Sequence, residues 1–106
     1  MATFEDFKKL EIKIGKIIKA ESHPNAEKLY LLLVDLGEKQ IQLVAGIKPF
    51  YAASELEGKL VTVVANLEPK NIRGVESQGM LLAAESKDDI SLVVADKNIP
   101  AGSLIK

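Results

Sequence analysis

EIKIGKIIKAES, residues 11–22, predicts one long and bent β-strand. Apolar side chains recur at alternate positions along most of it, as they do in a strand with one face on a core. Lys16 interrupts this alternation directly after Gly15. We therefore expect a β-bulge or a sharp bend at Gly15, of the kind that a barrel-closing strand needs. The side chains expected to face the core are those of Ile12, Ile14, Ile18 and Ala20.

Four more strands are predicted downstream, separated by residues that are typical of turns. Residues 28–36 are apolar on both faces, which suits a central strand. A short helix or loop is expected at residues 46–56, after the third strand. The other strands are expected at residues 40–44, 60–65 and 79–84. Five strands with this interruption are the signature of an all-β, five-stranded OB-fold, which is a small Greek-key barrel.

Both ends of the chain extend beyond this barrel. Thr3 and Asp6 form a predicted capping box for a short helix over residues 4–9. The tail, residues 86–106, carries several apolar side chains that the barrel does not require, each worth roughly 1.5–3 kcal/mol when buried. The tail either folds back over the barrel or forms a two-fold interface. We expect one domain over residues 1–106, made of a barrel at about 7–85 and a C-terminal extension at 86–106.

The overall composition limits the kinds of function. The chain of 106 residues has no cysteine, which excludes disulfides, thiolate metal ligands and a cysteine nucleophile. The longest apolar run, Leu29–Val34, is too short to cross a membrane, and we expect a soluble, cytoplasmic protein. The net charge is −1, whereas nucleic-acid-binding domains usually carry a strong positive excess. Any nucleic-acid site must therefore be a local cluster of charge.

The residue patterns that mark an active site do not occur in the sequence. The segment GVESQG, residues 74–79, has the spacing GxxSxG, whereas the nucleophile elbow of hydrolases needs GxSxG. His23 is the only histidine, and there is neither a phosphate-binding glycine loop nor a metal-ligand motif. We expect a protein that is not an enzyme and that has neither a cofactor nor a metal site.

The only arginine, Arg73, lies in the polar segment NLEPKNIRGVESQG, residues 66–79, between two apolar runs. Its planar guanidinium suits a phosphate group or a guanine edge. The alternative is an exposed ion pair with Glu68 or Glu76, worth about 0–1 kcal/mol. We expect the contact residues to gather at one end of the barrel. The other candidates are Lys28, which begins the second strand, and Asn66, Lys70, Ser77, Gln78 and Met80.

Several motifs, taken together, make the sequence recognisable. They are IGKIIKAESHPNAEKLYLLLVDLG at residues 14–37, LVAGI at 43–47, LVTVVANLEPKNIRGVESQGMLLAA at 60–84 and IPAGSLIK at 99–106. In order and spacing they resemble the tRNA-binding domain that is appended to methionyl-tRNA synthetases. Related versions of that domain occur in free-standing tRNA-binding proteins and in EMAP II-like cytokine precursors.

The resemblance implies an OB-fold that binds tRNA by its shape. It implies a homodimer through the C-terminal extension. It also implies a role as the β chain or C-terminal domain of methionyl-tRNA synthetase, in which the chain raises the tRNA affinity of the catalytic chain. Two departures, Ala45 where serine is common and Asn71 where many relatives have lysine, bear on affinity more than on fold. The contacts that the resemblance implies are at Lys28, Asn66, Arg73, Ser77, Gln78 and Met80.

A second class of proteins is also similar to the chain. Small secretion-chaperone-like OB-fold proteins are dimers of similar length, and they begin with a segment similar to TFEDFKKLEIKIGKI, residues 3–17. HPNAEKLY at residues 23–30 and ANLEPKNIRG at 65–74 look closer to the tRNA binders. Binding of extended, unfolded peptides in a groove therefore stays open as the alternative function.

Overall fold

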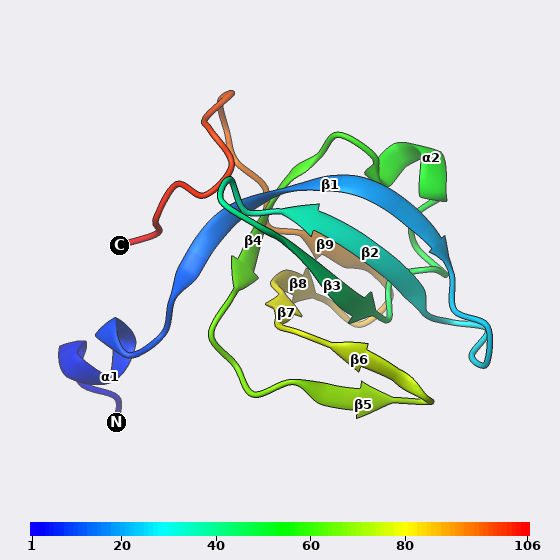
Figure 1. Ribbon diagram of the computed structural model, residues 1–106, viewed down its shortest axis with the longest axis horizontal. Helices are drawn as coiled ribbons and strands as arrows, with labels where there is room; N and C mark the ends of the chain where they lie inside the picture. Colours follow the sequence, from blue (N-terminus) through cyan, green and yellow to red (C-terminus); the bar gives the residue numbers. More distant parts are fainter.

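The longest strand, β1 (Ile12–Ser22), pairs antiparallel with two different strands along its length. Its first half pairs with β4 (Leu60–Val64) and its second half with β2 (Tyr30–Asp35). A strand shared in this way has to curve, and Figure 1 shows β1 arching over the rest of the sheet. The computed structural model describes all residues, 1–106.

Two more strands complete the sheet, β3 (Gln40–Ala45) and β7 (Met80–Leu81), in the order β3-β2-β1-β4-β7. The sheet is a nearly closed barrel, and strands hold 42% of the residues against 8% in helices. The fold is therefore all-β and OB-like, which confirms the predicted class.

Two short helices accompany the barrel. α1 (Phe4–Lys8) begins at the predicted capping box, in which the Thr3 N–H donates to Asp6 Oδ2 at 3.0 Å and the Asp6 N–H donates to Thr3 Oγ1 at 3.2 Å. α2 (Ala53–Leu56) follows the third strand, as predicted, and its Leu56 is fully buried. Neither helix has the length or the apolar composition that crossing a bilayer would need.

A bulge or a sharp bend was predicted at Gly15, whereas the pairing register of β1 shifts at Ile18. The register with β2 shifts between Ile17 and Lys19, so that Ile18 is the extra residue of a β-bulge. The side of the strand that faces the core changes before that shift, since Ile14, Gly15 and Ile17 are all buried and Ile18, next to Ile17, is 40% exposed. The expectation that Ile18 faces the core is therefore wrong. Gly15 allows close packing, since a Cβ there would overlap the Val34 side chain.

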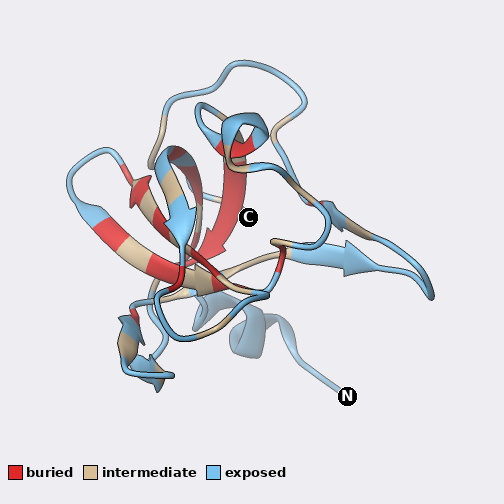
Figure 2. Cartoon of the chain, turned by 90° about the vertical axis from the view of Figure 1, so that its right-hand side faces the viewer, coloured by how far each residue is buried: buried red, intermediate tan, exposed pale blue.

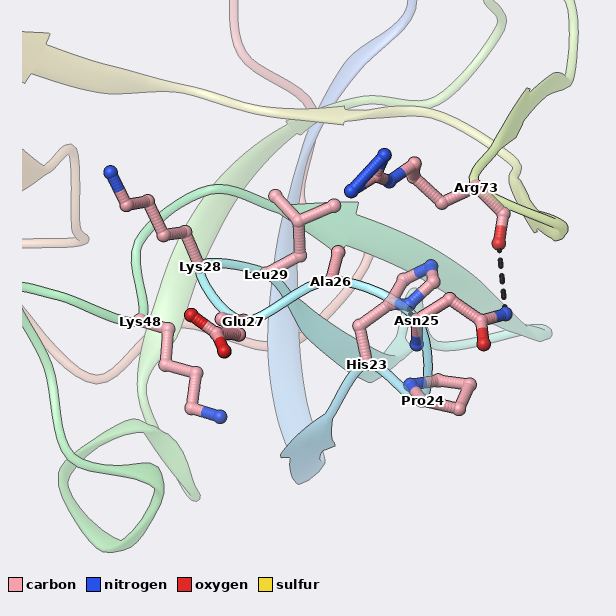
Figure 3. A pocket seen from close by; sticks show the side chains of 9 residues that line it. All are labelled: His23, Pro24, Asn25, Ala26, Glu27, Lys28, Leu29, Lys48 and Arg73. Atoms are coloured by element: carbon pink, nitrogen blue, oxygen red, sulfur yellow. Dashed lines mark hydrogen bonds between the residues drawn. The ribbon is translucent and has the colours of Figure 1, made fainter.

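Residues 66–79, expected to form a loop, contain a β-hairpin. β5 (Lys70–Ile72) pairs antiparallel with β6 (Val75–Ser77), and the two residues between the strands form the tip. The hairpin projects from the barrel, and its tip lies next to the turn between β1 and β2 (Figures 1 and 3). Sequence reasoning missed the hairpin because its strands have only three residues each and are rich in polar side chains.

The predicted last strand, residues 79–84, is divided between two sheets. β7 stays paired with β4, whereas β8 (Ala83–Glu85) pairs with β9 (Ile90–Leu92) in a second hairpin. Beyond β9 the chain returns to the barrel, where the Thr62 N–H of β4 donates to the Val93 carbonyl oxygen at 3.1 Å. The tail therefore folds back over the barrel, which was one of its two expected roles.

The core is the interior of the barrel, and Figure 2 shows the buried stretches on its strands, with α1 and the β5–β6 hairpin largely exposed. β2 alternates strictly between buried and partly exposed positions, because successive side chains of a strand point to opposite faces. Ile12 and Ile14 are buried as predicted, and Ala20 is partly buried. The largest fully buried side chains are Ile17, Leu32, Leu36, Leu43, Leu56, Val34, Val61 and Val63.

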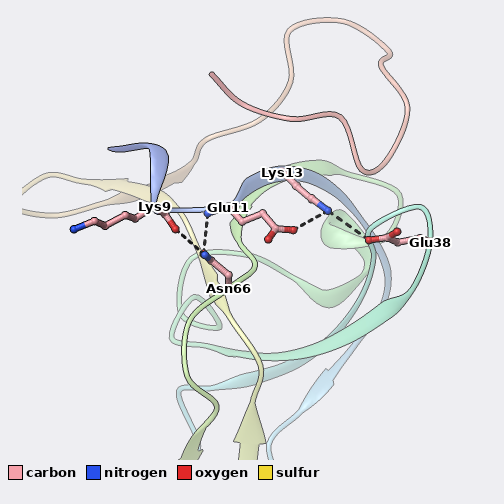
Figure 4. Close-up of polar contacts among 5 residues, drawn as sticks. All are labelled: Lys9, Glu11, Lys13, Glu38 and Asn66. Carbon is pink, nitrogen blue, oxygen red and sulfur yellow. Dashed lines mark hydrogen bonds and ion pairs between the residues drawn. The ribbon is translucent and has the colours of Figure 1, made fainter. Parts of the chain in front are cut away.

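Lys13 ties β1 to the turn between β2 and β3 through ion pairs. Its Nζ lies 2.9 Å from Glu11 Oε1 and 3.6 Å from Glu38 Oε1 (Figure 4). The Lys13 side chain is only 16% exposed, so these pairs are partly shielded from water. The hydrogen bond from Lys13, and then its charge, hold the pKa of the Glu11 carboxyl below its ordinary value. The same hydrogen bond raises the pKa of the Lys13 ammonium.

We expect Glu11→Gln to destabilise the fold at neutral pH and to lose this effect in acid. The lowered pKa of Glu11 means that its carboxylate stabilises the folded state above the unfolded-state pKa, and this contribution disappears as the pH falls through the folded-state pKa. The raised pKa of Lys13 affects stability only in the alkaline range. The stabilising contribution of its ammonium group is lost as the pH rises through the folded-state pKa.

Urea denaturation measures this difference. The midpoints of the wild type and Glu11→Gln should differ at about pH 7 and converge at about pH 3. Glu57→Gln is the control, because Glu57 is exposed and belongs to no ion pair. A difference between the wild type and Glu11→Gln that is the same at both pH values would contradict the account.

Candidate nucleic-acid interface

An open depression of about 810 Å³ lies between the β1–β2 turn, residues 23–29, and the tip of the β5–β6 hairpin (Figure 3). Three cationic side chains line it, those of Lys28, Lys48 and Arg73, against the one carboxylate of Glu27. A chain whose net charge is −1 thus gathers positive charge at one place. This is the local cluster that binding of a polyanion by a nearly neutral protein requires.

The Arg73 guanidinium has no ion-pair partner. Neither Glu68 nor Glu76 pairs with it, and the five ion pairs of the chain involve other residues. The alternative of an exposed intramolecular ion pair is therefore not what the structure shows. The planar Arg73 guanidinium is therefore free to bind a phosphate group or a base edge.

The backbone of Arg73 adopts a left-handed conformation at the hairpin tip. Its φ is 55° and that of Gly74 is 92°, so both residues of the two-residue loop have the positive φ that a type I′ turn requires. Arg73 is the only non-glycine residue of the chain with a positive φ. A residue with a Cβ costs about 1–2 kcal/mol in this conformation. Glycine or asparagine would lower that cost, so the arginine points to a constraint other than stability.

Lys48 belongs to the depression, and sequence reasoning missed it. It lies just beyond β3, in the segment that was expected only to form a short helix or loop. Its Nζ donates to Ser22 Oγ at 2.8 Å and lies 5.9 Å from the centre of the Tyr30 ring. The pairing of Tyr30 with Ala45 at the end of β3 brings Lys48 there, and a sequence alone does not give that register. Lys28 is exposed and forms no ion pair.

Ser77 and Gln78 close the barrel between β3 and the hairpin. Ser77 Oγ accepts from the Val44 N–H at 3.0 Å and donates to the Gly79 carbonyl oxygen at 3.0 Å, and the residue is buried. Gln78 Oε1 accepts from the Gln42 N–H at 2.8 Å. These side chains satisfy backbone groups along the edge of β3. The geometry therefore does not support a direct RNA contact by Ser77, and it gives Gln78 an internal partner.

Lys70 and Met80 are exposed but do not line the depression. Lys70 begins β5, opposite Ser77, and it has no ion-pair partner. Met80 begins β7, opposite Val64. Both side chains remain accessible to a ligand that is larger than the depression.

Asn66 lies beside α1, and the structure does not bring it together with Arg73. Its Oδ1 accepts from the Glu11 N–H at 2.8 Å, and its Nδ2 donates to the Lys9 carbonyl oxygen at 2.7 Å (Figure 4). Both polar groups of the side chain thus hold the start of β1. Figure 1 places α1 and the hairpin tip on opposite sides of the molecule. This corrects the expectation that all the candidate contacts gather at one end.

The depression offers contacts and no free general base. His23, the only histidine, has partners at both ring nitrogens: Nδ1 accepts from the Asn25 N–H at 2.9 Å, and Nε2 lies 2.9 Å from the Ile72 carbonyl oxygen. The chain has no group of three or more histidine, cysteine, aspartate or glutamate side chains that could hold a metal ion. The arrangement can bind an anion through its three cations.

Comparison with known proteins assigns the family. A family model described as "Putative tRNA binding domain" matches residues 12–104. The chain belongs to this family of tRNA-binding domains. The family is one of non-catalytic modules. The methionine–tRNA ligase of Pyrococcus horikoshii is 52% identical over 103 residues, which cover 97% of this chain and 14% of the ligase, so the chain spans only a small part of that relative.

Two crystal structures superpose on the whole chain. The MetRS related protein from Pyrococcus horikoshii has a TM-score of 0.93 at 37% identity, covering 100% of this chain and 98% of that one. The chaperone CsaA from Bacillus anthracis has a TM-score of 0.91 at 31% identity, covering 100% and 99%. The fold is therefore shared by proteins with different names, so the function has to be inferred from the side chains of the site and not from the fold.

Proposed function

We propose that the chain binds tRNA at the depression and catalyses no reaction itself. The observation that carries the proposal is the unpaired guanidinium of Arg73 at the hairpin tip, beside Lys28 and Lys48. Cations spread over an open surface neutralise phosphate groups and release counterions, which drives binding. Membership of the tRNA-binding domain family supports RNA as the polyanion.

The proposed recognition is of tRNA shape and not of base sequence. The groups at the depression are mainly cations, and phosphate contacts position a nucleic acid without reading its sequence. Aromatic residues make up only 5% of the chain, so a row of base-stacking side chains is not available. Lys70 and Met80 extend the proposed surface beyond the depression. The contributions of Asn66, Ser77 and Gln78 are to the fold that supports this surface.

We propose that the chain works in the cytoplasm with the catalytic chain of methionyl-tRNA synthetase, as its C-terminal domain or as a separate β chain. The match to the methionine–tRNA ligase over 97% of this chain supports that partner. A binding module attached to an enzyme raises the effective concentration of tRNA there, to about the millimolar range for a short flexible link. Weak contacts on the module are then sufficient, and anticodon identity stays with the catalytic chain.

We also propose a homodimer, formed over an apolar hollow of about 500 Å³ beside α1. α1 has five residues and buries none of them, so its own chain gives it little support. Phe4 is 71% exposed and Leu104, near the end of the tail, is 55% exposed, and a second copy would cover both. The proposed interface thus joins α1 to the C-terminal extension of residues 86–106. Its apolar members are Phe4, Phe7, Leu10, Leu104 and Ile105.

Peptide binding is the second candidate function, because the chaperone CsaA shares the fold at 31% identity. A groove that binds extended, unfolded peptides gains affinity by burying their apolar side chains. The apolar surface of this chain is the hollow beside α1, whereas the depression at Arg73 is lined by six polar or charged residues, two hydrophobic ones and Pro24. The cationic site therefore favours RNA over a peptide.

We expect Arg73→Ala to weaken tRNA binding and to reduce its dependence on salt. Loss of one phosphate contact lowers the slope of log affinity against log salt by about 0.7–0.9. Alanine keeps the cost of a Cβ at positive φ, so the folding stability should change little. Filter-binding titrations with bulk tRNA at several salt concentrations measure both quantities.

Lys97→Ala is the control for that experiment. Lys97 lines a different depression, and its substitution by alanine removes the same positive charge as Arg73→Ala does. Wild-type affinity and slope in Arg73→Ala would argue against the proposed contact. An unfolded peptide tested in the same assay separates the two candidate functions. Retention of the peptide without retention of tRNA would favour the chaperone-like alternative.

We expect Leu104→Glu to convert the proposed dimer to a monomer, because it places a charge in an apolar contact. Sedimentation velocity over a range of protein concentrations measures the change. Ile18→Glu is the control, since Ile18 is 40% exposed on the β1 bulge and does not line the hollow. A wild-type chain that is monomeric throughout, or a Leu104→Glu variant that sediments as a dimer, would refute the interface.

A further inference from the structure

We propose that His23 and Asn25 are positioning residues for Arg73. Their side chains bind the backbone of the hairpin tip and hold the guanidinium over the depression; we call these hydrogen bonds, from His23 to Ile72 and from Asn25 to Arg73, the latch. The inference rests on the proposed function in RNA binding. It extends that function to two residues that act through Arg73 and need no contact with RNA.

The His23 ring makes the first connection of the latch. The ring is buried, and its Nδ1 accepts from the Asn25 N–H at 2.9 Å, which requires an Nδ1 without a proton. The ring proton therefore lies on Nε2, which donates to the Ile72 carbonyl oxygen at 2.9 Å. Ile72 is the last residue of β5, so one neutral imidazole joins the β1–β2 turn to a hairpin 49 residues farther along the chain.

Asn25 makes the second connection. Its side-chain Nδ2 donates to the Arg73 carbonyl oxygen at 3.2 Å (Figure 3). Within the hairpin, Asn71 Oδ1 accepts from the Gly74 N–H at 3.0 Å. The carbonyl groups of Ile72 and Arg73 and the N–H of Gly74 are thus all held by side chains. Three backbone groups around Arg73 have fixed partners.

The hairpin tip needs such support, because the hydrogen bonds that reach it from outside the hairpin are those of His23 and Asn25. The base of the hairpin is attached to β3, where Gln42 Nε2 donates to the Glu76 carbonyl oxygen at 2.9 Å. β5, however, pairs only with β6. The positive φ of Arg73 is unfavourable for a residue with a Cβ, so a free tip would relax to other conformations. Relaxation would vary the spacing between Arg73 and Lys28 and lose a preorganised surface.

Asn25→Ala tests the latch, because it removes the hydrogen bond from the exposed Asn25 side chain to the Arg73 carbonyl oxygen. The backbone N–H of residue 25, which donates to His23 Nδ1, stays in place. We expect the tRNA affinity to fall about five-fold, the usual effect of one lost hydrogen bond. In an Arg73→Ala background the same change should alter affinity less than about two-fold, because residues that act through one another are not additive. Asn98→Ala, at another exposed asparagine, is the matched control and should bind as the wild type does.

A second measurement needs no RNA. Amide hydrogen exchange at Gly74 and the three-bond HN–Hα coupling of Arg73 report the order and the φ of the tip. Both should change in Asn25→Ala and stay at their wild-type values in Asn98→Ala. His23→Gln keeps one donor and one acceptor, so it should retain more tRNA affinity than His23→Ala.

The outcomes separate the two levels of the proposal. If the wild type binds tRNA and Asn25→Ala binds equally tightly, or if the tip keeps its exchange rate and coupling, the positioning role is overturned and RNA binding stands. Additive losses in the double variant also overturn the role, because Asn25 would then act independently of Arg73. A wild-type chain that binds no tRNA overturns the proposed function, and the positioning role fails with it.

Discussion

β1 divides its pairing between two partner strands, and this division shapes the whole sheet. One strand pairs with β4 through its first half and with β2 through its second, and the bulge at Ile18 lets it curve between them. The sheet therefore closes almost completely, and the edge of β3 comes to face the β5–β6 hairpin. Ser77 and Gln78 satisfy that edge with their side chains. Closure of the barrel thus fixes the position of the hairpin's base, and the β1–β2 turn fixes the position of its tip.

This arrangement gives a nearly neutral chain a concentrated cationic surface. Acidic and basic residues nearly cancel over the whole molecule, but Lys28, Lys48 and Arg73 converge on one depression. Arg73 is held there in a conformation that carries a cost in stability, and it is left without an intramolecular partner. An unpaired cation in a strained backbone conformation, held in place by the latch, is typical of a binding surface and does not stabilise a core. The proposed division of labour leaves catalysis to a partner chain.

Much of the fold could be predicted from the sequence, because hydrophobic alternation and turn residues act locally. The barrel strands, the capping box at Thr3 and the helix after the third strand all follow from such patterns. A bulge or a sharp bend was predicted at Gly15, whereas the register shifts at Ile18, because the pairing with β2, which the sequence does not give, determines where the extra residue lies. The β5–β6 hairpin was missed because its strands are short and polar.

The site was predicted less completely than the fold. Arg73 and Lys28 do line one depression, but Arg73 lies on a hairpin tip that was not predicted, and Lys28 lies in the β1–β2 turn and not, as predicted, at the start of the second strand. Asn66, Ser77 and Gln78 are polar residues in a polar segment, and nothing in the sequence shows that their hydrogen bonds are already used within the fold. Lys48 and the latch residues His23 and Asn25 depend on contacts between distant segments, which only the register of the barrel reveals.

Hydrogen–deuterium exchange of the full chain, measured with and without bulk tRNA, shows whether the β1–β2 turn and the hairpin form one tRNA-binding surface. We expect tRNA to slow exchange in two segments that are far apart in sequence, residues 23–29 and residues 70–77, which meet at the depression. Slowed exchange confined to α1 and the end of the tail, with the turn and the hairpin unchanged, would refute tRNA binding at the depression.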